Sequence, residues 1–177
     1  MSETIIVTFH QLNAQVLSLS QGSLKPNNIQ LNWLDLFEKL VIWKYEGFHY
    51  PYLNSKFCGL IDKIKIDRTQ CRIDLVFVVA DVDAEPQCAR NLTDNTTRLL
   101  SRNAGEAADK RVHVVFKVDP AQPCIANIAM EHERGVSTRV FINTLNYLFR
   151  HARKYNQDQS VKSFFIGEHP TDRLFVS

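Results

Sequence analysis

The sequence lacks any long hydrophobic run, because its longest unbroken apolar stretch extends only from Leu75 to Ala80. A helix that spans a bilayer needs about 20 apolar residues, so no such helix is predicted. The first residues also lack the basic segment and apolar core of a secretory signal, since the apolar run there covers only Ile5 to Val7. From these absences we expect a cytoplasmic protein with no membrane partner.

Cysteine is scarce, and the motifs that usually mark a metal or cofactor site are missing. The four cysteines, at positions 58, 71, 88 and 124, form no C-x-x-C pair, so neither a zinc ribbon nor a thioredoxin-like site is predicted. The six histidines include no pair spaced by four residues, and there is no P-loop, G-x-S-x-G or G-x-G-x-x-G motif. We therefore expect no cofactor and favour a protein that is not an enzyme.

Hydrophobic residues are nevertheless plentiful enough to build a core. The 177 residues are 45% hydrophobic and 23% charged, which is ordinary globular usage and suits one domain over residues 1–177. Because the chain ends on an apolar stretch from Leu174 to Val176, an alternative expectation is that it forms the N-terminal part of a larger functional unit.

Hydrophobic periodicity predicts an α+β fold in which two principal helices, at about 32–43 and 137–154, pack against a mainly antiparallel sheet. Asn32 is a suitable N-cap for the first helix. Strands are expected at 4–11, 57–66, 71–80, 111–118, 124–131 and 161–166, with a short second hairpin formed by 87–92 and 96–102.

Three local features refine this fold. Residues 18–28 are polar and contain Gly22 and Pro26, so we expect a loop there. Imperfect alternation in the strand after residue 57 favours a bulge near Gly59. The strand that follows is nearly all apolar from Leu75 onward, which indicates a central strand covered on both faces.

The second predicted helix has two contrasting faces. Ser137 is a suitable N-cap, and the apolar residues Phe141, Leu145, Leu148 and Ala152 fall together at about 100° per residue, which predicts a face in the core. The far face holds no Asp or Glu. Its arginines can bind phosphates, and its asparagines can hydrogen-bond base edges. Basic residues near a helix C-terminus are also common on solvated faces, which explains the charge without a ligand. The candidate residues are Arg139, Asn143, Asn146, Arg150 and Arg153, with Lys154 beside them and Arg134 before the helix.

Aromatic residues gather in the segment from Trp43 to Tyr52, which is flanked by Lys44 and Lys56. Exposed aromatic rings beside cations can stack on unpaired bases or form a protein interface. Packing within a sheet explains the same pattern without any ligand. The candidate stacking or interface residues are Trp43, Tyr45, Tyr50 and Tyr52.

Carboxylates alternate directly after the most apolar strand, at Asp81, Asp83 and Glu85. Oxygen ligands of this kind can hold a magnesium ion, and such a site could cleave a phosphodiester. The segment lacks the glycine and the spacing of a calcium loop, and the same residue types are common in turns. The metal site therefore stays an alternative.

The layout from Phe57 to Phe149 resembles uncharacterised bacterial proteins from mobile-element and phage-defence neighbourhoods. Four features carry the resemblance. They are the long hairpin over 57–80, the Asp-rich turn that begins at Asp81, His113 within a strand, and the run from Glu131 to Gly135 that leads into the last long helix. The resemblance implies an antiviral-defence or mobile-element context and assigns no functional residue.

Charge is concentrated in one part of the chain. From Lys110 to Lys154 there are eight Lys and Arg against three Asp and Glu, a net charge of +5, which leaves −3 for the rest of the sequence. We therefore predict a non-enzymatic module that binds DNA or RNA through the basic helix face. The alternatives are a metal-dependent nuclease and a protein-interaction subunit or homodimer that does not bind nucleic acid.

Overall fold

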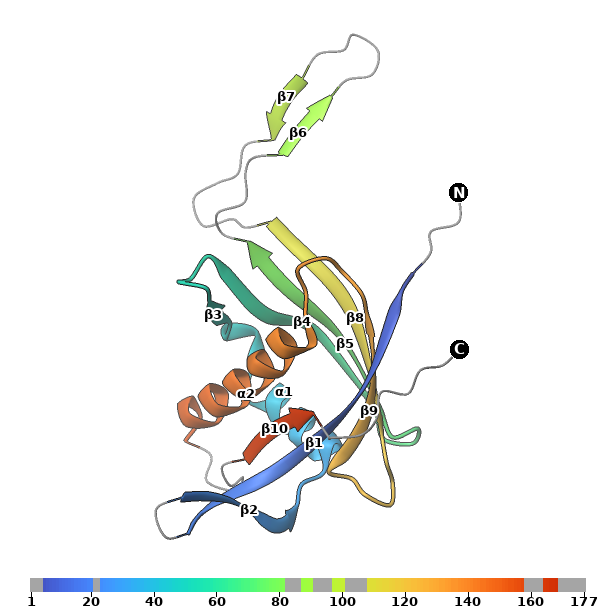
Figure 1. The fold of residues 1–177 in the computed structure, drawn as a ribbon, viewed down its shortest axis with the longest axis vertical. Coiled ribbons are helices and arrows are strands. Elements are labelled where there is room, and N and C mark those ends of the chain that lie inside the picture. The colour runs from blue at the N-terminus through green and yellow to red at the C-terminus, as the bar shows by residue number, and fades with distance from the viewer. Residues whose placement is uncertain are drawn as a thin grey trace.

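In the computed structural model, an antiparallel sheet of eight strands curls around two helices (Figure 1). This arrangement is the α+β fold that the sequence predicts. The structure describes residues 5–20, 23–81, 87–90, 97–100, 108–157 and 164–168. The strand order is β10-β1-β9-β8-β5-β4-β3, and β2 pairs with the far end of β1. The strands of this sheet are β1 Val7–Ser20, β2 Ser23–Gln30, β3 Tyr50–Tyr52, β4 Phe57–Asp67, β5 Arg72–Asp81, β8 Ala108–Val118, β9 Ile125–Glu131 and β10 Phe164–Glu168.

Both predicted helices are confirmed, together with their caps. Helix α1 covers Trp33–Ile42, and the Asn32 side chain accepts a hydrogen bond from Leu34 N at 2.9 Å. Helix α2 covers Thr138–Tyr155, and Ser137 Oγ accepts from Val140 N at 3.3 Å. A 3-10 turn, η1 Tyr45–Gly47, follows α1. In the parts of the chain that the structure describes, no helix has the length and apolar character that a bilayer crossing requires.

The central hairpin of the sheet is also confirmed. Strand β5 lies between β4 and β8, and its residues from Phe77 to Ala80 are buried on both faces of the sheet. The register of β4 shifts between Ile61 and Lys63, so the bulge lies at Asp62 instead of near Gly59. The second predicted hairpin forms a separate two-stranded sheet from β6 Gln87–Arg90 and β7 Thr97–Leu100, beyond the ends of β5 and β8 (Figure 1).

The prediction of a loop at 18–28 is wrong, because β1 continues to Ser20 and pairs with β2. Pro26 lies within β2 opposite Leu17. A proline is tolerated there because β2 pairs with β1 and lies off the main strand path, and an edge strand can spare the N–H that proline lacks. The polar composition of 18–28 therefore reflects an edge hairpin.

The core lies between the inner face of the sheet and the two helices. Phe116 of β8 contacts both helices, with ring centroids 5.2 Å from Phe37 of α1 and 6.0 Å from Phe141 of α2. Phe37 and Phe149 join the helices directly at 5.7 Å. These rings are almost completely buried, and edge-to-face pairs of this kind stabilise a core beyond the area that they bury.

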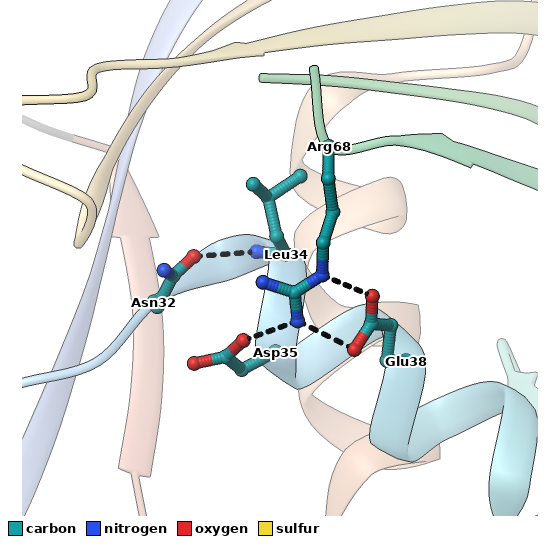
Figure 2. A network of polar contacts seen from close by, with 5 residues as sticks. All are labelled: Asn32, Leu34, Asp35, Glu38 and Arg68. Carbon is teal, nitrogen blue, oxygen red and sulfur yellow. Dashed lines mark hydrogen bonds and ion pairs between the residues drawn. The ribbon is translucent and has the colours of Figure 1, made fainter. Parts of the chain in front are cut away.

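The turn between β4 and β5 is attached to α1 by a polar network (Figure 2). Arg68 donates to both carboxylate oxygens of Glu38 at 2.5 Å and to Asp35 Oδ1 at 2.6 Å. The hydrogen bond from Arg68 holds the pKa of Glu38 below its ordinary value. Burial of Glu38 acts in the opposite direction, and the positive charge of Arg68 adds to the lowering. The network fixes the far end of the hairpin over the first turns of α1.

Candidate nucleic-acid interface

Helix α2 lies along the inner side of the curled sheet (Figure 1). Its predicted apolar face is confirmed, since Phe141, Leu145, Leu148 and Ala152 are completely buried. The helix contacts β3, β4 and β10, so its flanks as well as its apolar face meet the rest of the protein. Only a part of the far face therefore reaches solvent.

Four residues of the predicted binding face form an exposed ridge, which we call the basic ridge: Arg139, Asn143, Arg150 and Lys154. Arg153 is half-buried beside it. Residues 138–155 contain four Lys and Arg and no Asp or Glu, so no acid within the helix reduces the positive charge. Arg134 is exposed in the turn before α2, and its carbonyl accepts a hydrogen bond from Lys110 Nζ at 2.7 Å, which adds two cations at the N-terminal end of the ridge.

Asn146 differs from the other predicted binding residues, because its side chain holds β10. Its Nδ2 donates to Ile166 O at 2.9 Å, and Ile166 N donates to its Oδ1 at 2.9 Å. The amide thus makes both bonds that a neighbouring strand would make to Ile166. These bonds satisfy the backbone groups of an edge strand, and they occupy the amide group that would be needed to hydrogen-bond a base.

The opposite flank of α2 carries an aromatic strip, which comprises Tyr147, His151 and Tyr155. These residues recur every four positions, so they lie in line on one side of the helix. Tyr147 stacks on His151 with ring centroids 3.9 Å apart. Tyr147 also lies 5.3 Å from Tyr50 of β3, and Tyr155 lies 5.7 Å from Phe48. The structure therefore joins the aromatic segment and the basic helix, which are about 100 residues apart in the sequence.

The four aromatic residues predicted for stacking divide into two pairs. Trp43 and Tyr45 are only 2% and 5% exposed, so they belong to the core and offer no ring face to a ligand. Tyr50 and Tyr52 are half-buried and stack on each other at 5.8 Å. Burial is the main reason why the pKa of Tyr52 is raised, and the nearby Cys58 and Asp81 act in the same direction. The Tyr52 hydroxyl therefore stays neutral at physiological pH.

The predicted metal ligands are only partly within the described structure. Asp81 is half-buried at the end of β5, whereas Asp83 and Glu85 lie outside the described residues. Among the residues with a described position, no three His, Cys, Asp or Glu side chains come together closely enough to hold a metal ion.

Sequence reasoning missed the aromatic strip, although its signal is present in the sequence. The spacing of Tyr147, His151 and Tyr155 by four residues marks one side of a helix. That side borders the predicted basic face, but nothing in the helix alone shows that Tyr50 and Phe48 lie beside it. The contact depends on how β3 packs against α2.

The sheet face that points away from the helices offers a contrasting charged surface. A hollow of about 530 Å³ lies over β4, β5 and β8, and its floor includes Val76 and Val115. Its acids are paired, since Arg72 contacts Asp74 at 2.7 Å and Arg111 contacts Asp62 at 3.2 Å. Lys63 and Lys65 are exposed at its border.

Comparison of the chain with protein-family models, with curated proteins and with solved structures finds no match.

Proposed function

We propose that this protein binds nucleic acid through the basic ridge of α2. The observation that supports the proposal is a set of exposed cations on a helix that contains no Asp or Glu. Arg68, Arg72 and Arg111 each pair with a carboxylate of the described structure. Of the cations on the ridge, Arg139, Arg150 and Lys154 contact no described carboxylate. Their charge is therefore available to a ligand.

The chemistry of these cations fits a polyphosphate backbone. Arginine can donate two parallel hydrogen bonds to one phosphate, and each phosphate contact releases counterions. Arg150 and Lys154 are four residues apart, so they lie about 6 Å apart along the helix axis. Two cations at this spacing can contact neighbouring phosphates of one strand. Arg139 lies about 16 Å from Arg150 along the axis, with exposed Asn143 between them.

The test is a charge reversal on the ridge with a matched reversal elsewhere. Binding of fluorescein-labelled DNA and RNA, single- and double-stranded, is measured by anisotropy at low salt. The variant Arg150→Glu/Lys154→Glu is expected to lose at least tenfold in affinity, and the wild-type protein to show the steep salt dependence of phosphate contacts. The control, Lys63→Glu/Lys65→Glu, changes the net charge by the same amount on the opposite face. The proposal is wrong if the wild type binds no nucleic acid, or if both variants bind equally well.

A second candidate function, contact with another protein, is favoured by exposed apolar residues at the start of β1. Val7 and Phe9 lie two residues apart in the strand and Ile5 lies just before it, and Ile5, Val7 and Phe9 are 66%, 40% and 64% exposed. Clustered apolar residues in solvent often mark protein interfaces. Light scattering of the wild type and of Phe9→Glu tests the homodimer version, which requires a dimer that the substitution dissociates. A monomeric wild type at all concentrations excludes it.

The setting of this function is part of the proposal. We place the protein in the cytoplasm, in a phage-defence or mobile-element context. The support for that context is the resemblance of the layout from 57 to 149. Pull-down of nucleic acid from infected and uninfected cells would test it, because a defence role requires enrichment of invading sequences.

A further inference from the structure

We propose that the ligand is an unpaired strand of DNA or RNA, whose phosphates lie on the basic ridge and whose bases stack on the aromatic strip. This inference rests on the proposed function and names its substrate class. It is carried by the position of α2 between two flanking strands and by the parallel rows of cations and rings on its surface.

The contacts on both flanks of α2 prevent the helix from entering the major groove of a duplex. A recognition helix enters a major groove about 12 Å wide, and both of its sides must be free to do so. On one side of α2, Asn146 is hydrogen-bonded to Ile166 of β10. On the other side, Tyr147 contacts Tyr50 of β3 and Tyr155 contacts Phe48. Both flanks of the helix are therefore in contact with the rest of the protein, and only the exposed surface between them can meet a ligand.

Cations and rings run side by side along this exposed surface. At about 100° per residue, the ridge residues fall between Asn146 on one flank and the aromatic strip on the other. Arg150 and Lys154 repeat every four residues, as do Tyr147, His151 and Tyr155, so both rows advance by about 6 Å per member. An unpaired strand has its phosphates along one edge and its bases along the other. A duplex keeps its bases paired inside and offers nothing to the rings.

One ring of the strip is largely accessible, and the other two are half-buried and held in place by their neighbours. Tyr155 is 77% exposed, whereas the large rings of the core, such as Trp33 and Phe37, are completely buried. Tyr147 is half-buried and contacts both His151 and Tyr50, which restrict its movement. Rings that are already ordered lose little conformational freedom when a base stacks on them, which favours binding.

The experiment compares four labelled probes of equal length by anisotropy at low salt: twelve-nucleotide oligo-dT, twelve-nucleotide oligo-rU, an abasic DNA strand and a twelve-base-pair duplex. The abasic strand keeps the phosphates and lacks the bases. We expect either oligo-dT or oligo-rU, or both, to bind at least tenfold more tightly than the abasic strand and the duplex. The ratio between oligo-dT and oligo-rU identifies the natural strand as DNA or RNA.

Variants of the strip test the stacking directly. Tyr155→Ala and Tyr147→Leu are expected to weaken oligo-dT or oligo-rU binding about five- to tenfold and to leave binding of the abasic strand unchanged. Tyr155→Phe retains the ring and is expected to bind as the wild type does. The matched control is Phe9→Ala, which removes an exposed ring of β1 that lies outside the aromatic strip. Tyr155 is so exposed that its loss should leave the fold intact, which thermal unfolding verifies.

The failure of this inference differs from the failure of the proposed function. If Arg150→Glu/Lys154→Glu abolishes binding, but the abasic strand or the duplex binds as tightly as oligo-dT and oligo-rU, the ligand is a phosphate backbone and the stacking inference is wrong. Unchanged affinity in both Tyr155→Ala and Tyr147→Leu contradicts it as well. If the wild type binds none of the four probes, both proposals fail.

Discussion

At the scale of single residues, the contact between Gly59 and α2 shows why this position of the sheet is a glycine. Helix α2 crosses β4 at this point, and a Cβ placed on Gly59 would overlap Thr144 Oγ1. Thr144 is completely buried, and its hydroxyl donates to Val140 O at 2.9 Å, so it has little freedom to move aside. Glycine at 59 therefore sets how closely α2 approaches the sheet, and with it the position of the basic ridge.

We predict that Gly59→Ala lowers the free energy of unfolding by about 1–3 kcal/mol, because the added methyl overpacks a close helix–sheet contact. Urea unfolding measures the change. The control is Gly47→Ala, where a Cβ meets nothing within 4 Å, and which should change stability by less than about 0.5 kcal/mol. Adding Thr144→Ala should recover part of the loss, since it removes the atom that the new methyl meets. Equal stabilities of Gly59→Ala and the wild type would contradict this explanation.

Two asparagines of α2 show the limit of reading residue types from a helix face. Asn143 and Asn146 both fall on the predicted binding face, yet Asn143 is exposed while Asn146 is hydrogen-bonded to the backbone of β10. The sequence cannot separate them, because the partner strand lies 20 residues farther along the chain. The same limit applies to Trp43 and Tyr45, which the sequence offers as stacking residues and which are buried in the structure.

At the scale of elements, the β4–β5 hairpin and α1 are joined at the surface by the Arg68 network. Because Glu38 has a lowered pKa in the folded state, its ion pair stabilises the protein above the ordinary pKa of 4.5. This contribution is lost as the pH falls through the lowered pKa, where Glu38 becomes protonated. Arg68 and Glu38 are both substantially exposed, so the contribution is small.

We predict that Arg68→Ala is less stable than the wild type by up to about 1 kcal/mol at neutral pH, and that the difference shrinks on acidification. Urea unfolding in a pH series from 7 to about 3 measures both proteins. Lys63→Ala serves as the control, because this exposed lysine forms no ion pair in the described structure, and its small effect should not depend on the pH in this range. A wild-type advantage that stays constant down to the lowest pH would show that Glu38 is not involved.

At the scale of the whole molecule, the central strands of the sheet are more extensively paired than the strands at its edges. Strands β5 and β8 pair along ten residues each and carry completely buried residues such as Phe77 and Val114. Within the described residues, β3 is a three-residue strand that pairs with β4, and β2 pairs with β1. Local opening should therefore begin at these margins, one of which supports the aromatic strip.

We predict that backbone amides of β5 and β8 exchange most slowly with deuterium, and those of β3 and β2 much faster. Hydrogen exchange followed by mass spectrometry measures this directly. If an unpaired strand binds as proposed, its addition should slow exchange in β3 and in the C-terminal half of α2 while leaving β5 unchanged. Equal protection of β3 and β5 in the free protein would contradict the described topology.

The sequence by itself determined the elements whose signals are local. The periodic apolar faces and the caps at Asn32 and Ser137 predict both helices, and alternation predicts the β4–β5 hairpin and β8, because these patterns depend on neighbouring residues. Only the tertiary structure decided that β1 pairs with both β9 and β10, that Asn146 holds an edge strand, and that Tyr147 meets Tyr50. These contacts join residues that are distant in the chain, and no local pattern specifies which distant surface will cover a given face. For the candidate site, the sequence thus supplied the cations and rings of α2, and the fold placed Tyr50 and Phe48 beside them.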